Sequence, residues 1–192
     1  ASMDKLAALV NSFGSAVLSV GREVGLSIAL DKSKVSQGVK VSNVCVAALI
    51  GIVGKGARGT VSIMQNKDSF ETVVTAMSGG MIAPNVEDPV SMSVVAELAN
   101  MIGGRALLQS ALGQVDVTPP QMITGENIKN IPQPGPTMKS FTLPFNLQPK
   151  GKYQVSVCLG TACYVKGSGV IFDKISEKLG IIKCPLLSKN FR

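Results

Sequence analysis

A carboxylate and a carboxamide stand three residues apart, at Glu97 and Asn100, in a stretch whose apolar residues recur at helical spacing. Side chains at this separation are neighbours on one face of an α-helix. The carboxamide cannot act as a general base, but it donates and accepts hydrogen bonds at once and could hold a water molecule in place. A polar strip on an amphipathic helix is more often its solvated side, so the spacing alone leaves both interpretations open.

The chain of 192 residues contains no histidine. This absence excludes Ser-His-Asp and Cys-His catalysis, histidine phosphorelay and most zinc or haem sites. Ser93, one turn before Glu97, has neither a histidine nor a nearby lysine to activate it, so we expect it to support a site rather than to react. Chemistry therefore has to come from carboxylates, amides, hydroxyls, thiols or lysines.

The helix that carries the pair is predicted to begin at Asp88-Pro89, an N-cap followed by proline at the first helical position, and to continue to about Leu112. One polar arc of about 60° on its helical wheel consists of Ser93, Glu97, Asn100 and Gly104. The predicted core face consists of Val90, Val94, Leu98, Met101 and Ile102. A second face of mostly small residues, expected to pack closely, consists of Met92, Ala96, Ala99 and Ala106. Gly104 has no side chain and leaves room for another backbone beside the pair.

The remaining pattern predicts elements on both sides of this helix. Helices are expected at 4–24 and at 68–78, the second with an N-cap at its start and with Gly79-Gly80 at its end. Residues 38–53 and 59–64 read as a strand–turn–strand hairpin. An irregular connection is expected at 118–137, followed by two closing strands at 141–145 and 152–159 with a turn at 149–151.

The spacing of Ser93, Glu97 and Asn100, with Met-Ile-Gly-Gly directly after the asparagine, closely resembles the signature of the CheC/CheX/FliY chemotaxis phosphatases, and of CheX in particular. Further segments agree in the same order along the chain: 10–13, 50–54, 59–61, the prolines 119–120 with Gly125, and 141–145. The resemblance covers residues 4–159. Pro119 and Pro120 come a few residues earlier than the family pattern places its proline. The resemblance therefore does not determine which residues form the rim of the pocket.

The resemblance implies an α/β fold of the α+β type, a large mainly antiparallel sheet with long helices packed on it. It also implies a phosphatase that hydrolyses the aspartyl phosphate of a CheY-like response regulator. Asn100 would position the attacking water, and Glu97 would dock to the regulator's active-site lysine. We expect no cofactor or metal in this chain, because Mg²⁺ would come with the regulator. A non-catalytic signalling adaptor of the same fold is the alternative. CheX-like chains pair, so we expect a homodimer, with an exposed edge of the strand 152–159 as a natural seam.

A second resemblance concerns the cysteines. The run 152–168, with Cys158 and Cys163, and its continuation to 181 closely resemble the start of the thioredoxin-like [2Fe-2S] domain of NuoE-type subunits, where two such thiolates are half of a four-thiolate set. The other half is missing, since only Cys184 follows and Cys45 is expected in the core. Residues 160–192 are therefore treated as an extension, with a helix favoured at 172–179. An iron–sulfur electron carrier is a third, weaker hypothesis.

The composition sets the wider frame. A net charge of +7 without aromatic stacking platforms or a helix-turn-helix pattern argues against nucleic-acid binding. The longest apolar stretch, 44–53, has about half of the ~20 residues that a membrane span needs. We expect no membrane association and a cytoplasmic location. Residues 1–3 resemble a remnant of cloning and are left out of the expected domain.

Overall fold

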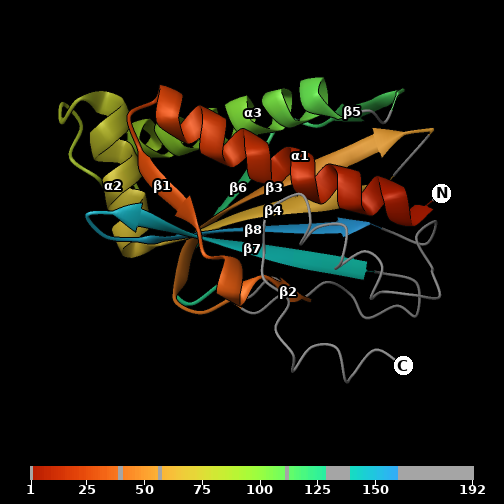
Figure 1. Ribbon diagram of the computed structural model, residues 1–192. Helices are drawn as coiled ribbons and strands as arrows, with labels where there is room; N and C mark the ends of the chain where they lie inside the picture. The colour runs from red at the N-terminus through yellow and green to blue at the C-terminus, as the bar shows by residue number, and fades with distance from the viewer. Residues whose placement is uncertain (1, 39–40, 56–57, 111–112, 129–138, 160–192) are drawn as a thin grey trace.

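The computed structural model describes residues 2–38, 41–55, 58–110, 113–128 and 139–159. Within these residues the chain forms three α-helices, α1 (Ser2–Glu23), α2 (Lys67–Ser78) and α3 (Pro89–Gln109), and a 3-10 turn at Lys32–Lys34. The strands are β1 (Ser27–Leu30), β2 (Ser36–Gln37), β3 (Val44–Gly54), β4 (Gly59–Asn66), β5 (Val115–Val117), β6 (Gln121–Thr124), β7 (Lys139–Gln148) and β8 (Lys152–Leu159). Figure 1 shows α1 and α3 side by side above the sheet, with α2 at one end of it.

The strands of the described residues form one sheet in the order β1-β7-β8-β4-β3-β5, with β2 also paired to β7 and β6 to β3. Every one of these pairings is antiparallel. The predicted fold class, an antiparallel sheet with long helices packed on it, is confirmed.

The prediction of an exposed edge at 152–159 is wrong. Strand β8 lies between β4 and β7, so that Val155 is paired with Ile63 on one side and with Leu143 on the other. Both edges of β8 are used within the sheet, and it offers no seam to a second copy. The expected homodimer itself stays a prediction.

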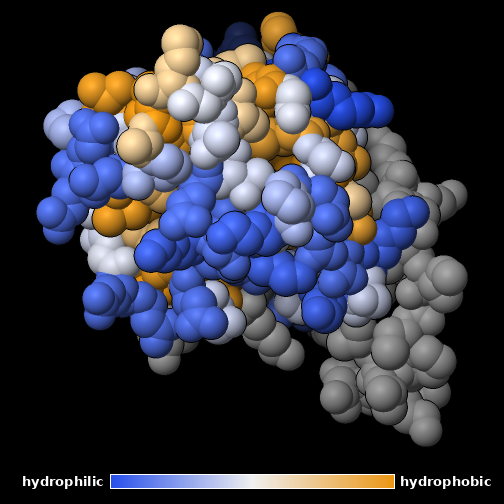
Figure 2. Space-filling view, turned by 90° about the vertical axis from the view of Figure 1, so that its left-hand side faces the viewer, coloured by the Kyte–Doolittle hydropathy of each residue, from blue (hydrophilic) through white to orange (hydrophobic). Residues whose placement is uncertain are grey.

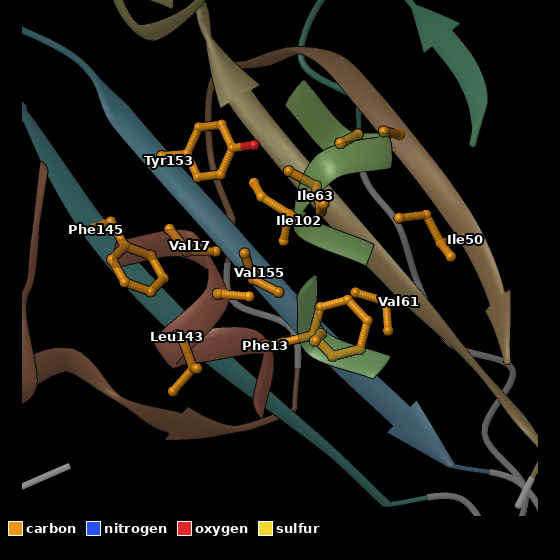
Figure 3. Packing of buried hydrophobic residues seen from close by; sticks show 14 of the residues in the cluster. Phe13, Val17, Ile50, Val61, Ile63, Ile102, Leu143, Phe145, Tyr153 and Val155 are labelled. Atoms are coloured by element: carbon orange, nitrogen blue, oxygen red, sulfur yellow. The ribbon is translucent and has the colours of Figure 1, made fainter. Parts of the chain in front are cut away.

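The main core lies between the sheet and the helices. Side chains from β3, β4, β7 and β8 alternate, and one set points toward α1 and α3, as the period of two along a strand requires. Phe13 and Val17 of α1 and Ile102 of α3 meet this set in Figure 3. Val155 at the centre is fully buried. The core is the platform on which α3 rests.

The ends of α2 differ in one detail from the sequence-based expectation. The cap is Asn66 rather than Asp68, because the Asn66 side chain accepts a hydrogen bond from the backbone N–H of Ser69 at 2.9 Å. The same Asn66 oxygen accepts from the N–H of Lys152 at 3.0 Å. At the other end Gly79 adopts the left-handed conformation at the predicted stop. Asn66 therefore joins the start of α2 to the turn between β7 and β8.

Two other boundaries also differ. Helix α3 ends at Gln109 rather than near Leu112, and the backbone N–H of Ser110 returns to the Leu107 carbonyl at 3.1 Å. The connection expected to be irregular at 118–137 contains β6, which pairs with β3 from Val46 to Leu49. The expected helix at 172–179 lies outside the described residues.

No helix in the described part of the chain combines the length and the apolarity that crossing a membrane would need.

Candidate functional site

Helix α3 begins where the sequence predicts. Asp88 caps it by accepting a hydrogen bond from the N–H of Val90 at 3.0 Å, and Pro89 occupies the first turn. Ser91, which sequence reasoning did not single out, is fully buried just inside this end. Its hydroxyl donates to the Ala83 carbonyl at 3.3 Å and accepts from the N–H of Asn85 at 3.2 Å. The loop before α3 is thereby held against the helix. The sequence offered one signal for this role, because Ser91 lies on the apolar side of the helical wheel.

The predicted polar arc lies on the outside of the molecule. Its four members, Ser93, Glu97, Asn100 and Gly104, are all exposed. Glu97 and Asn100 project from successive turns of α3, and in the described part of the chain neither side chain forms a hydrogen bond or an ion pair. A carboxylate and a carboxamide are thus presented side by side with their hydrogen-bonding capacity unused.

The two supporting residues differ in what they offer. The Ser93 hydroxyl donates to the Pro89 carbonyl at 2.8 Å, four residues earlier in the same helix, so its proton is already engaged. A Cβ added at Gly104 would meet no atom within 4 Å. The space expected beside the pair is therefore present at Gly104.

The buried face of α3 agrees with the predicted core face only at Leu98 and Ile102. Val90 is 54% exposed, and Val94 and Met101 are only half-buried. The buried residues are Ser91, Val95, Leu98, Ala99, Ile102, Gly103 and Ala106. Four of these seven residues are small, which lets α3 pack closely against α1 and the sheet. A Cβ at Gly103 would already lie 3.5 Å from Ile50. The predicted second face of small residues thus supplies part of the contact with the core, through Ala99 and Ala106.

An ion pair ties α3 to α1 beside the arc. The Arg105 guanidinium donates to both carboxylate oxygens of Glu23, at 2.7 and 2.9 Å, and also to the Ser19 hydroxyl at 3.3 Å. The hydrogen bond from Arg105, together with its positive charge, lowers the pKa of Glu23 against a contribution from partial burial. The same carboxylate raises the pKa of Arg105. Such a two-pronged contact constrains orientation as well as distance.

The two described cysteines, Cys45 and Cys158, lie on opposite sides of the sheet. Cys45 packs against the core cluster on the helix side of the sheet. Val157 belongs to the same cluster, so its neighbour Cys158, which is buried, points to the opposite side. Burial also raises the pKa of the Cys45 thiol, which disfavours the thiolate that iron requires. These two sulfurs cannot serve one cluster while the sheet is intact. Cys163 and Cys184 lie outside the described residues.

Among the described residues, no group of three or more cysteine, aspartate and glutamate side chains is placed to hold a metal ion. The exposed arc of α3 presents hydrogen-bonding groups and one negative charge, that of Glu97.

Comparison with known proteins gives two family matches. Residues 46–146 match the family described as chemotaxis phosphatase CheX. Residues 137–186 match the family described as thioredoxin-like [2Fe-2S] ferredoxin. The second match begins inside the first, which ends at residue 146.

Two solved structures share most of the chain's fold. A chemotaxis protein CheX from Desulfovibrio desulfuricans is 25% identical with a TM-score of 0.57, over 79% of this chain and 98% of that one. The CheX-CheY-BeF3-Mg²⁺ complex from Borrelia burgdorferi contains a chain that is 23% identical with a TM-score of 0.61, over 79% of this chain and 97% of that one. The second likeness concerns the fold alone.

A local likeness concerns the second family. The subunit HndA of an NADP-reducing hydrogenase from Solidesulfovibrio fructosivorans is 50% identical over 42 residues. These residues are 22% of this chain and 25% of that relative, so the chain spans about a quarter of the relative's length. The likeness does not extend to a whole ferredoxin domain.

Proposed function

Because the chain belongs to the chemotaxis phosphatase family CheX and has its CheX/CheC-like fold, we propose that it hydrolyses the aspartyl phosphate of a CheY-like response regulator. The observation that carries the proposal is the pair Glu97 and Asn100, exposed side by side on α3 without a partner among the described residues. A pair that forms no hydrogen bond or ion pair within the described residues can bond to another protein.

Asn100 is assigned to the water. Its carboxamide oxygen accepts a hydrogen bond from the attacking water, while its N–H₂ group can donate to the phosphoryl group. The water oxygen bonds to phosphorus as the bond to the aspartyl oxygen breaks, and the products are the free aspartate carboxylate and inorganic phosphate. An acyl phosphate is already activated, so orienting the water supplies much of the required rate without a strong base.

Glu97 is assigned to docking. Its carboxylate pairs with a lysine of the regulator, which sets the register that places Asn100 opposite the phosphorus. Mg²⁺ belongs to the regulator in this proposal and neutralises the phosphoryl oxygens there. The solved CheX-CheY-BeF3-Mg²⁺ complex from Borrelia burgdorferi supports the choice of a CheY-like partner, as a precedent in a protein of similar fold.

The test is the release of phosphate from a panel of phosphorylated receiver domains, with and without the protein. The wild-type chain should accelerate release for at least one receiver. Glu97→Ala should raise KM, because it removes the docking charge. Binding of a receiver without acceleration would identify the non-catalytic adaptor instead.

A further inference from the structure

The exposed stripe of α3 extends beyond the polar pair. Between the first and last residues of the helix, the exposed positions are Val90, Ser93, Glu97, Asn100, Gly104 and Leu108. At about 100° per residue they fall within an arc of about 80°. Figure 2 views the end of the molecule that carries α2, with α3 running away from the viewer, and shows hydrophobic and hydrophilic residues mixed above a hydrophilic band. We call these six residues the α3 stripe.

The composition of the α3 stripe is unusual for a solvated helix face. Such a face is normally rich in charged and polar residues. Here Glu97 is the one charged residue of the six, and the hydroxyl of Ser93 is already bonded within the helix. Leu108 is 87% exposed and Val90 is 54% exposed. One exposed aliphatic side chain needs no explanation, but two on one charge-depleted stripe match the composition of a protein interface.

The two aliphatic residues bracket the pair. Val90 and Leu108 are separated by 18 residues of helix, or about 27 Å, which is close to the diameter of a small domain. Glu97 and Asn100 lie near the middle of this length. A single compact domain that placed its reactive group over the pair would therefore reach both ends of the α3 stripe.

A second copy of this chain is a poor occupant of the α3 stripe. A two-fold contact centred on it would bring the Glu97 side chains of both copies together. Since the α3 stripe carries no lysine or arginine, nothing on it would balance the two carboxylates. A partner with a positive group opposite Glu97 and apolar surface on either side fits better.

We infer that Val90 and Leu108 are the apolar anchors of a docking surface for one receiver domain, and that their contacts with the receiver flank the Glu97–Asn100 pair on both sides. The inference rests on the proposed function and adds a binding role for residues outside the signature. Contacts at the two ends exclude solvent from the centre, as the rim of an interface does around its most important groups. One held water then remains at the phosphoryl group instead of bulk solvent. The bare backbone of Gly104 lets the receiver approach between Asn100 and Leu108.

The experiment compares Val90→Lys and Leu108→Lys with Val53→Lys. Val53 is 47% exposed on β3 and points away from the helices, because its neighbour Ile52 belongs to the helix-side core. Binding of a BeF3-activated receiver domain is followed by fluorescence anisotropy, and dephosphorylation is followed by phosphate release. Each α3 variant should raise both Kd and KM about tenfold, from the lost burial of one aliphatic side chain. The kcat should stay within about twofold, since neither residue touches the phosphoryl group. Val53→Lys should change neither.

The outcomes separate the inference from the proposed function. Unchanged Kd and KM in both α3 variants, with an active wild-type chain, would overturn the anchors and leave the phosphatase standing. A wild-type chain that binds the receiver without dephosphorylating it, and loses binding in Leu108→Lys, would overturn catalysis and support the anchors. A chain that binds no receiver overturns both. Urea denaturation of each variant, together with Leu108→Gln as a neutral second substitution, separates lost docking from lost folding.

Discussion

The guanidinium of Arg105 donates two hydrogen bonds to the carboxylate oxygens of Glu23, at 2.7 and 2.9 Å. Arg105 directly follows the exposed Gly104 in α3. The contact joins the last turn of α1 to α3. Its place next to Gly104 puts it directly beside the α3 stripe, and it adds to the buried face of α3 in holding the orientation of the helix. The pair is on the surface, with its side chains 31% and 50% exposed, so its value lies in orientation more than in stability.

The first prediction concerns the pH dependence of this pair. Hydrogen bonding to Arg105 lowers the pKa of Glu23 below its usual value of 4.5, so the folded state favours the ionised carboxylate. Its contribution is complete above the unfolded pKa and is lost as the pH falls through the lower folded pKa. Thermal denaturation should show a small loss of Tm in Glu23→Gln at neutral pH that disappears in strong acid. A Tm difference that stays constant between about pH 7 and about pH 3 would contradict this.

The second prediction separates two adjacent glycines of α3. Gly104→Ala places its methyl in open space on the α3 stripe, whereas Gly103→Ala places it 3.5 Å from Ile50, inside the contact with the sheet. The exposed substitution should raise the free energy of unfolding by about 0.5–1 kcal/mol, since alanine is the better helix former. It should also raise KM for the phosphorylated receiver, because the methyl occupies the approach to Asn100.

Gly103→Ala serves as the matched control, since its methyl points away from the receiver. Urea denaturation and steady-state phosphate release measure the two effects. Equal kinetics for Gly104→Ala and wild type would show that the receiver does not come close to this part of the α3 stripe.

The third prediction concerns Asn66, whose side chain serves both the N–H of Ser69 and the N–H of Lys152. Asn66→Ala removes the helix cap and leaves the turn at Lys152 without its acceptor. We expect a loss of about 1–2 kcal/mol in urea denaturation. Asn66→Asp keeps an acceptor oxygen in the same place and should recover most of the loss. An Asn66→Ala variant as stable as wild type would rule out this dual role.

The fourth prediction concerns iron. Cys158 is buried in an interior strand, on the opposite side of the sheet from Cys45. We expect the purified protein to be colourless and free of iron, because a cluster needs four thiolates that converge. Visible absorption and iron analysis measure this. An absorption band that bleaches with dithionite and disappears in Cys158→Ser would contradict the prediction and revive the electron-carrier hypothesis.

Much of the fold follows from local pattern. The start of α3 at Asp88-Pro89, the stop of α2 at Gly79, and the strands β3, β4, β7 and β8 were all predictable from caps, glycines and β-branched runs. The short strands β1, β2, β5 and β6 were not. They have two to four residues each and are held by pairing to the outer edges of β7 and β3, which local sequence does not encode. The interior position of β8 is also a tertiary property.

The residues of the candidate site could be predicted from the sequence, but the packing and the ion pair around them could not. Spacing put Ser93, Glu97, Asn100 and Gly104 on one face, and the structure places all four on the exposed side of α3. The wheel assigned Val90 to the core because hydrophobicity was taken as burial. The close packing of α3 against α1 and the sheet buries small residues instead, and Val90 lies outside this contact. The tie from Arg105 to Glu23 spans 82 residues of sequence and has no local signal.

The most direct measurement of the central claim pairs binding and turnover in one variant, Asn100→Ala. Its affinity for a BeF3-activated receiver should stay within about threefold of wild type, because Glu97 and the ends of the α3 stripe are unchanged. Its acceleration of phosphate release should fall by about a hundredfold or more, as when one positioned hydrogen-bonding group is lost from an active site. An Asn100→Ala protein that binds the receiver and dephosphorylates it as fast as wild type would contradict the assignment of Asn100 to the water.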